Sequence, residues 1–378
     1  MRNIANMFCI HGEFEDAAPY GQGHINDTYM SRWNQAGTTV RYLHQRINHA
    51  VFVRPDEVME NILRVTRHIA GKLAAAGTAG WIRRVLTVVP SRDGNPWVRD
   101  AEGGWWRTYL FIENAHSLDV ASTPEEACFL GASIGNFQKQ LADLKGERLH
   151  ETIPRFHDME NRYRRFHEAL RSDSANRAED TRSRTESGAK CRAEKAAAEI
   201  LFMEENEERG AILIRALRDG RIPERICHND TKMNNILIDN ADNRALCVAD
   251  LDTVMPGTSL FDLGDLIRTA ASRAEEDERD LTKVIFDPGF FRALLEGYLS
   301  EALDFLIPAE TELLAEAGRN ITQIMALRFL TDYLEGDHYY HTTRSGHNLD
   351  RCRNQIALIR SMDSQWEALL DTVRALCV

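Results

Sequence analysis

The sequence predicts an α+β protein with a small β-rich N-terminal part and a larger, mainly helical C-terminal part. Strand-like runs and one long helical pattern fill the chain up to residue 112, and helical patterns dominate from Pro124 onward. We therefore place the division between residues 1–112 and residues 113–378. A chain of 378 residues is long enough for one domain with two such parts.

The N-terminal part begins with a glycine-containing turn at Gly21 and continues with extended segments. The run Thr38–Ile47 is rich in β-branched and aromatic residues, and Ile82–Val89 and Trp105–Ile112 are also strand-like. Between them, Asp56 to about Ala75 carries apolar residues at helical spacing. These are Val58, Ile62, Val65 and Ile69. We expect strands packed against one helix.

The C-terminal part begins with a helix at Pro124, where proline and two glutamates are typical of a first helical turn. Residues 172–192 are polar and predict a mobile loop or a solvated helix. A turn-prone stretch joins Ile236–Asp239 to Ala245–Ala249, which predicts a β-hairpin inside the helical region. Residues 290–377 predict several further helices.

The composition indicates a soluble, cytoplasmic protein. Lys and Arg total 46 against 58 Asp and Glu, a net charge of −12, which argues against nucleic acid or an anionic membrane as partner. No apolar run approaches the roughly 20 residues of a membrane span, and the N-terminus lacks a secretory apolar region. The seven cysteines are scattered, so we expect reduced and mostly buried thiols.

The motif that carries most information is His228-Asn-Asp-Thr-Lys-Met-Asn-Asn235. Its spacing, His, then Asp two residues later and Asn five after that, matches a kinase catalytic loop. A carboxylate at Asp230 can orient an attacking hydroxyl and accept its proton, and the amide oxygen of Asn235 can help to hold Mg²⁺. His228 is better suited to bracing the loop than to reacting.

A second acidic motif, Ala249-Asp-Leu-Asp252, follows the second strand of the hairpin. A hard cation needs carboxylate oxygens, and a strand end can place one opposite Asn235. Asp250 is the main candidate for a magnesium ligand and Asp252 a weaker one. Asp262 opens an apolar helix and is better interpreted as a helix cap or as a support for the catalytic loop.

The N-terminal part is less regular as a phosphate-binding region. Gly21-x-Gly23 can fold over phosphates, but the third glycine of the G-x-G-x-x-G pattern is replaced by Asn26. The strand expected to supply a phosphate-contacting lysine has none. Gln45 and Arg46 stand there instead, on opposite faces of the strand because side chains alternate.

Two interpretations stay open for Arg46. It either contacts phosphate or is an exposed strand arginine, and Glu60 on the following helix either pairs with it or lies on the surface. Elsewhere, Asp337-His-Tyr-Tyr-His341 with His347 resembles a metal cluster only by composition, because zincin-type spacing is missing. A serine hydrolase is disfavoured because no G-x-S-x-G elbow occurs.

Five segments together resemble one known family more closely than the kinase-like fold in general. They are Asn229–Lys232, Asp250–Gly257, Gly23–Tyr29, Leu43–Asn48 and Phe329–Leu334. From about Gly21 to Leu358 the chain resembles the N-acetylhexosamine 1-kinases, which belong to the aminoglycoside phosphotransferase and choline kinase branch of the protein-kinase-like fold. His44 departs from the aliphatic residue expected there, which leaves the phosphate-anchoring side chain open between Gln45 and Arg46.

The resemblance implies a two-lobed kinase, with residues 1–112 as the nucleotide-binding lobe, that uses ATP and Mg²⁺. It would phosphorylate the anomeric hydroxyl of N-acetylglucosamine or N-acetylgalactosamine. Asp230 would then be the base and Lys232 would lie near the transferred phosphate, while Asn235 and Asp250 hold magnesium.

The resemblance also implies a sugar site and an adenine site. His24, Arg328 and Tyr339 fall where the sugar is approached, and Phe111 to Glu113 would form the hinge that meets adenine. The expected partners are a small sugar and ATP. A kinase of another sugar, an amino alcohol or an aminoglycoside is the nearest alternative, and a catalytically silent nucleotide-binding scaffold is the second.

Overall fold

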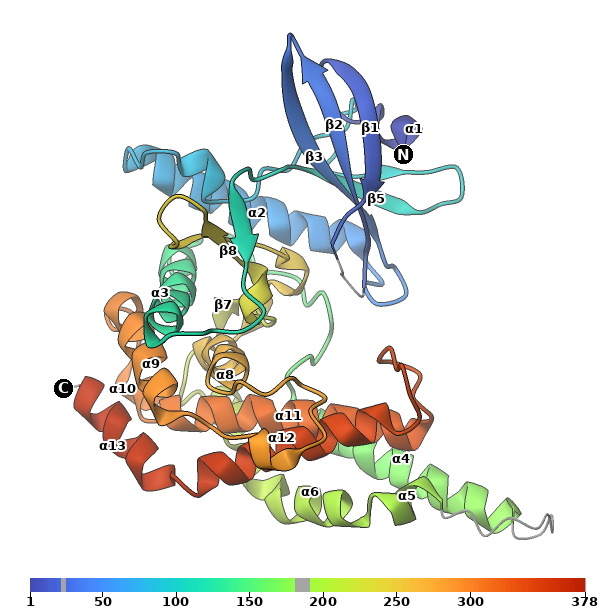
Figure 1. Ribbon diagram of the computed structural model, residues 1–378, viewed down its shortest axis with the longest axis vertical. Coiled ribbons are helices and arrows are strands. Elements are labelled where there is room, and N and C mark those ends of the chain that lie inside the picture. The colour runs from blue at the N-terminus through green and yellow to red at the C-terminus, as the bar shows by residue number, and fades with distance from the viewer. Residues whose placement is uncertain (22–24, 181–190, 378) are drawn as a thin grey trace.

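The protein consists of a twisted β-sheet with one long helix beside it, standing over a larger group of helices (Figure 1). The computed structural model describes residues 1–21, 25–180 and 191–377. The predicted α+β class, with a β-rich N-terminal part and a helical C-terminal part, is confirmed.

The N-terminal sheet has five antiparallel strands in the order β1-β2-β3-β5-β4. Strand β3 runs over Thr38–Ile47, as predicted, and β5 over Trp105–Leu110. The other strands are β1 (Glu13–Pro19), β2 (Asp27–Gln35) and β4 (Val98–Arg99), and a short helix α1 (Arg2–Ala5) precedes them. Strand β1 was missed because it precedes the first turn signal used, at Gly21.

Helix α2 (Pro55–Ala75) is the predicted N-terminal helix, and Pro55 occupies its first turn. Its apolar face is buried, with the four predicted positions all 4% exposed or less. These side chains pack with Ile47 of β3 and Tyr109 of β5 in one hydrophobic cluster. Helix α2 therefore holds the inner face of the sheet against the rest of the molecule.

One predicted strand is wrong. Residues 82–89 do not form a strand: Trp81–Arg83 is a short 3₁₀ helix (η1), and only Val88 makes an isolated β-bridge, with Tyr109. The apolar run alone could not separate a strand from an irregular buried connection, because both place aliphatic side chains in the core. Val85 and Val89 are indeed buried.

The chain leaves the first sheet at Leu110 and enters a second sheet at β6 (Ala115–Ser117), which pairs with β8. The predicted hairpin is confirmed as β8 (Ile236–Asp239) and β9 (Ala245–Val248). The division at residues 112 and 113 stays a prediction. Strands β7 (Arg225–Cys227) and β10 (Met255–Gly257) form a two-stranded pair. In the sequence, β7 precedes the motif that begins at His228 and β10 follows the acidic motif that ends at Asp252.

Helices make up most of the remainder, as predicted from Pro124 onward. Helix α3 begins with a capping box in which Thr123 and Glu126 satisfy each other's backbone donors. The helices are α3 (Pro124–Leu141), α4 (Met159–Asp180), α5 (Arg192–Lys195), α6 (Ala197–Gly210), α7 (Ile212–Arg218), α8 (Ser259–Ala270), α9 (Pro288–Ala302), α10 (Pro308–Thr311), α11 (Leu314–Glu335), α12 (His347–Asp363) and α13 (Trp366–Leu376). Short 3₁₀ turns are η2 (Met233–Asn235), η3 (Leu251–Thr253) and η4 (Leu281–Lys283).

Three further expectations concern the polar stretch, the cysteines and membrane-spanning segments. The start of the polar stretch 172–192 continues α4 to Asp180, while residues 181–190 lie outside the described part. The cysteines are free, but only Cys227, Cys247 and Cys352 are buried, so "mostly buried" was wrong. No helix within the described ranges has the length and apolar character needed to cross a membrane.

Candidate active site

The catalytic-loop motif lies between β7 and β8 and is held by a buried carboxylate of α8. Asp262 accepts hydrogen bonds from the backbone N–H groups of His228 (3.0 Å) and Asn229 (2.7 Å). Asn229 has a positive φ of 64°, a conformation that asparagine tolerates better than most residues. The interpretation of Asp262 as a support for the loop is confirmed, whereas the cap of α8 is Thr258.

His228 braces the loop, as predicted from the sequence. Its Nε2 lies 2.8 Å from the carbonyl oxygen of Ala249, the residue that precedes Asp250. The backbone N–H of Ala249 donates in turn to the carbonyl of Asn235 (2.8 Å). These two bonds bring the end of β9 against the catalytic loop, which sets the two acidic motifs side by side.

Asp230 stands in this loop with a cation and an amide beside its carboxylate. Lys232 Nζ lies 3.2 Å from Asp230 Oδ2, and the side-chain amide of Asn235 donates to the same oxygen at 3.1 Å. Burial tends to raise the pKa of Asp230, but Lys232 and His228 outweigh it, so the pKa lies below the usual value. The carboxylate is therefore ionised at neutral pH, and it is 31% exposed.

Asp250 follows β9 with a positive φ of 56°. Its side chain is accessible to solvent, yet the surrounding protein, together with the charges of Asp252 and Asp230, raises its pKa to about 6. A carboxylate whose charge is disfavoured by like charges is well suited to a cation. Oxygens from Asp250 and Asn235 are the donor types that Mg²⁺ uses alongside phosphate oxygens.

Strands β2, β3 and β5 of the N-terminal sheet form the other side of this region, called the roof here. Gln45 and Arg46 of β3 point to opposite faces of the strand, as alternation predicts. Arg46 lies on the outer face, 3.9 Å from the carboxylates of Asp100 and Glu102, and its side chain is 38% exposed. This geometry favours the exposed-arginine interpretation of Arg46.

The suggested pair between Glu60 and Arg46 is not formed. Glu60 is a 56% exposed residue on α2 whose partner is His150, at 3.0 Å. Position 60 lies one residue beyond Met59, which is buried. A helix turns by about 100° per residue, so the side chain of Glu60 points to the surface instead of the sheet.

Arg107 on β5 is a buried residue of this region that was not predicted from the sequence. Its guanidinium is 1% exposed and forms an ion pair with Asp252, and its Nε donates to Gln45 Oε1 at 2.9 Å. The neighbouring strand register pairs Gln45 with Arg107 directly. The signal available in the sequence was an arginine in an otherwise apolar and aromatic strand, Trp105–Leu110, which is hard to bury without a partner.

Asp252 is also bonded from the turn before β2. The side-chain amide of Asn26 donates to Asp252 at 2.7 Å, and its oxygen accepts from the backbone of Asn48. Gly21 has a positive φ of 76°, which suits glycine in a turn. Gly23 and His24, both predicted site residues, lie outside the described residues.

The predicted hinge begins at Phe111, directly after β5. The guanidinium of Arg41 lies over the ring of Phe111, 4.1 Å from its centroid, and pairs with the carboxylate of Glu113. Tyr20 meets the same ring edge-on, with centroids 5.4 Å apart. The hinge segment is thus fixed by Arg41 of β3 and by Tyr20, which directly follows β1.

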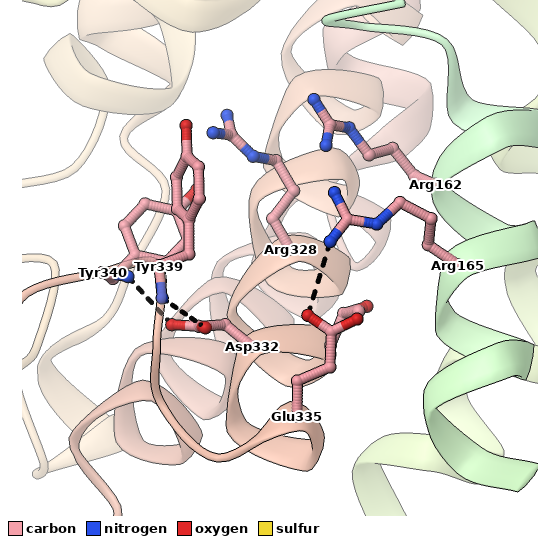
Figure 2. Close-up of a pocket in the computed structure, with 8 residues that line it drawn as sticks. Arg162, Arg165, Arg328, Asp332, Glu335, Tyr339 and Tyr340 are labelled. Atoms are coloured by element: carbon pink, nitrogen blue, oxygen red, sulfur yellow. Dashed lines mark hydrogen bonds and ion pairs between the residues drawn. The ribbon is translucent and has the colours of Figure 1, made fainter. Parts of the chain in front are cut away.

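A pocket lies beside α11, and Figure 2 shows that three guanidinium groups gather on one side of it. Arg162 and Arg165 come from α4 and Arg328 from α11. The lining residues are Arg162, Arg165, Arg328, Thr331, Asp332, Glu335, Tyr339 and Tyr340. Two predicted substrate residues, Arg328 and Tyr339, are therefore brought together.

The charges in this pocket are not balanced by its acids. Asp332 accepts hydrogen bonds from the backbone of His338, Tyr339 and Tyr340 instead of pairing with an arginine. Arg165 pairs with Glu335 at 3.4 Å, the one arginine–carboxylate pair among the described lining residues. The pocket therefore carries surplus positive charge.

The two other arginines interact with neutral groups. Arg162 donates to the carbonyl of Phe156 at 2.6 and 3.1 Å, and burial together with Arg328 lowers its pKa to about 10. Arg328 lies 4.9 Å from the ring centroid of Phe156 and 5.7 Å from that of Tyr339. Both guanidinium groups keep donors for a ligand.

The pocket is joined to the catalytic loop by His157. Its Nε2 lies 2.9 Å from the carbonyl oxygen of Asn229, and its ring contacts that of Phe156, with centroids 4.6 Å apart. Burial lowers the pKa of Arg328, but Tyr340, Tyr339 and Asp230 together outweigh it, so the net shift is upward. Asp230 is thus close enough to influence the pocket electrostatically.

In the histidine-rich stretch after α11, His347 has a carboxylate partner. His347 Nε2 lies 2.9 Å from Asp277, which also pairs with Arg344 at 3.0 Å. In the part of the chain that the structure describes, no group of three or more His, Cys, Asp or Glu side chains is arranged to hold a metal ion.

The fold and the loop define a kinase-like phosphotransferase. The sequence pattern of the phosphotransferase enzyme family (APH) matches residues 16–306, and the chain belongs to that family. Enzymes of this family transfer a phosphoryl group to a hydroxyl acceptor and use ATP. The predicted branch of the kinase-like proteins is thereby confirmed.

Two solved structures share the fold. An aminoglycoside phosphotransferase from Alicyclobacillus acidocaldarius subsp. acidocaldarius DSM 446 is 13% identical, with a TM-score of 0.60 over 100% of this chain and 97% of that one. An ethanolamine kinase from Plasmodium vivax is 13% identical, with a TM-score of 0.53 over 92% of this chain and 84% of that one.

Proposed function

We propose that this phosphotransferase moves the γ-phosphate of ATP to the anomeric hydroxyl of an N-acetylhexosamine and releases the sugar 1-phosphate. The observation that carries the acceptor side of this proposal is the arginine-lined pocket beside Asp230. Its surplus positive charge opposes a cationic acceptor, so an aminoglycoside, choline or ethanolamine is disfavoured there. A neutral sugar rich in oxygen acceptors fits guanidinium donors.

In this reaction Asp230 would orient the sugar hydroxyl toward the γ-phosphorus and accept its proton. The new bond from the sugar oxygen to phosphorus would form as the bond from the γ-phosphorus to the bridging oxygen breaks, which releases ADP. Lys232 would lie close to the transferred phosphate and neutralise charge in the transition state. Asn235 and Asp250 would hold Mg²⁺, which neutralises charge on the phosphates when bound. Most of the rate enhancement in phosphoryl transfer comes from such positioning and charge neutralisation.

The acceptor would lie against Arg328 and Tyr339. The hydroxyl of Tyr340 is buried and has no hydrogen-bond partner among the described residues, so it too is available to a ligand. Phe111 and Glu113 would meet the adenine at the hinge, and Gly21 with Gly23 would cover the phosphates. His24 would approach the sugar from the same turn.

The test is ATP consumption with Mg²⁺ across N-acetylglucosamine, N-acetylgalactosamine, glucose, galactose, choline, ethanolamine and kanamycin. We expect turnover of an N-acetylhexosamine, with a sugar 1-phosphate signal in the phosphorus NMR spectrum. Turnover of kanamycin or an amino alcohol alone would contradict the acceptor assignment and leave the phosphotransferase class standing. ADP binding together with silence across the panel would favour the catalytically silent nucleotide-binding scaffold.

A further inference from the structure

Strand β3, part of the roof of the proposed nucleotide cleft, lacks the lysine that protein kinases place against the phosphates. This strand carries Gln45 on its inner face and Arg46 on its outer face. Three carboxylates, of Asp230, Asp250 and Asp252, lie close enough to influence one another. A polyphosphate approaching them needs a positive charge nearby.

Arg107 supplies a positive charge at this place from the neighbouring strand. It is paired with Gln45 in the antiparallel register of β3 and β5, and its Nε bonds to the Gln45 side chain at 2.9 Å. Gln45 also donates to Thr28 on β2 at 3.2 Å. The guanidinium of Arg107 is thus fixed beside Gln45, the inner-face position of β3 at which a lysine is missing.

The other contacts of Arg107 direct it toward the acidic motif. Its Nη1 pairs with Asp252 on η3. The charge of Arg107 also acts on Asp250, whose pKa it helps to lower against the effect of burial. Arg107 and Lys232 are therefore the two cations among these three carboxylates.

Stability alone explains this arrangement poorly. The desolvation of a buried ion pair offsets most of its Coulombic attraction, so an apolar pair of similar volume is often equally stable. Arg107 and Asp252 are 1% and 4% exposed at their side chains, and the pair joins the roof to the floor of the cleft at the phosphate end.

We propose that Arg107 is the phosphate-binding cation of this cleft, supplied by β5 in place of a lysine on β3. Gln45 and Asp252 hold its guanidinium in position while no nucleotide is bound, and nucleotide phosphate then takes the place of Asp252 as its anionic partner. This inference rests on the proposed nucleotide use and goes beyond it, because it assigns the phosphate contact to a residue outside the family motifs.

Calorimetric titration of adenosine and ADP in metal-free buffer tests the proposal without any acceptor. For Arg107→Gln we expect ADP affinity to fall about tenfold to a hundredfold, the range of one charged hydrogen bond. Adenosine has no phosphate, so its affinity should stay within about twofold of that of wild type. A matched control is Arg32→Gln, an exposed arginine of the same sheet paired with Asp16. It should change neither titration.

A second variant keeps the test decisive if Arg107→Gln does not fold. Arg107→Met combined with Asp252→Asn removes both buried charges, so no unpaired ion is left. If Arg107 binds phosphate, ADP affinity still falls. If Arg107 only neutralises Asp252, the two charges removed cancel each other, ADP affinity stays close to that of wild type, and the proposal is overturned.

Two other outcomes are equally informative. Equal losses for adenosine and ADP would mean that Arg107 shapes the cleft without contacting phosphate, which overturns the assignment. Unchanged ADP affinity in Arg107→Gln would overturn it as well. If wild-type protein bound no ADP at all, the proposed function would fail first, so the two failures are distinguishable.

Discussion

The floor and the roof of the nucleotide cleft are built in different ways. The floor comes from two short segments, the catalytic loop and the start of η3, joined by backbone hydrogen bonds and held from behind by Asp262. The roof comes from β2, β3 and β5, whose contributing residues are far apart in the chain. The one buried ion pair described between them is Arg107 with Asp252.

The positions of the floor residues therefore depend on local spacing in the sequence, whereas the positions of the roof residues depend on strand register. On the floor, the distance from His228 to Asn235 is set by a few backbone dihedrals and one carboxylate. On the roof, a single-residue shift of β5 against β3 would turn Arg107 to the outer face. The floor therefore depends on local spacing, whereas the cation that we propose for the roof comes from β5 and not from β3.

The largest effect is expected on the floor. Asp230→Asn removes the proton acceptor and should lower kcat by about a hundredfold to ten-thousandfold, the range of general base catalysis. Steady-state kinetics with the acceptor found in the panel would measure it, while calorimetry should show ADP still binding. Asp219→Asn, at the exposed end of α7, is the control. Turnover near wild type would remove Asp230 from its proposed role.

A smaller effect on the kinetics is expected from a substitution in the proposed acceptor pocket. Arg328→Gln should raise the KM for the acceptor about tenfold or more, because a guanidinium hydrogen bond is lost, and leave the KM for ATP nearly unchanged. This is the opposite of the pattern expected for Arg107 on the roof. Equal changes in both KM values would show that the two sites are not separated as proposed. Arg353→Gln, on α12 and paired with Glu199, serves as control.

The smallest effect concerns the interior of the roof. His44 is wholly buried between Ser31 and Thr108, 2.7 and 2.8 Å from their hydroxyl oxygens, and burial lowers its pKa to about 4. The unfolded chain therefore binds this proton more readily between pH 6.5 and 4. Stability contributed by neutral His44 is lost as the pH falls, by about 2 kcal/mol between pH 7 and 5.

Urea unfolding of wild type and His44→Asn at pH 7 and pH 5 would measure this contribution. The variant should be less stable at pH 7 and show a shallower loss on acidification. His157, whose pKa burial lowers to about 3, keeps part of the slope in both proteins. His49→Asn, in the exposed turn after β3, should leave the slope unchanged. Parallel pH profiles for wild type and His44→Asn would contradict the prediction.

Much of the fold and the floor of the site could be predicted from the sequence. The helix at 55–75 and the strand at 38–47 were predicted because their periodicity and composition agree with their tertiary environment. The loop around Asp230 and the support by Asp262 were predictable because few turns can carry these groups at this spacing. His44 was recognised as unusual, but its two hydroxyl partners lie on β2 and β5.

The wrong and missing predictions have two physical reasons. The apolar composition of residues 82–89 predicts a strand, but a buried irregular segment has the same composition. The local sequence shows neither the partners of Arg107 nor that Glu60 points away from Arg46, because side-chain pairing across strands and helices depends on strand register and helix rotation. Neither quantity is written in local sequence.

The α+β class, the kinase-like loop and its carboxylates could be predicted from the sequence alone, because they follow from short-range spacing and backbone geometry. Three other features depend on the tertiary structure: which cation lies opposite these carboxylates, that the pocket beside α11 collects three arginines from α4 and α11, and that Asp332 of this pocket accepts backbone hydrogen bonds instead of pairing with an arginine. Those features arise between segments distant in the chain, where packing and strand register select each partner.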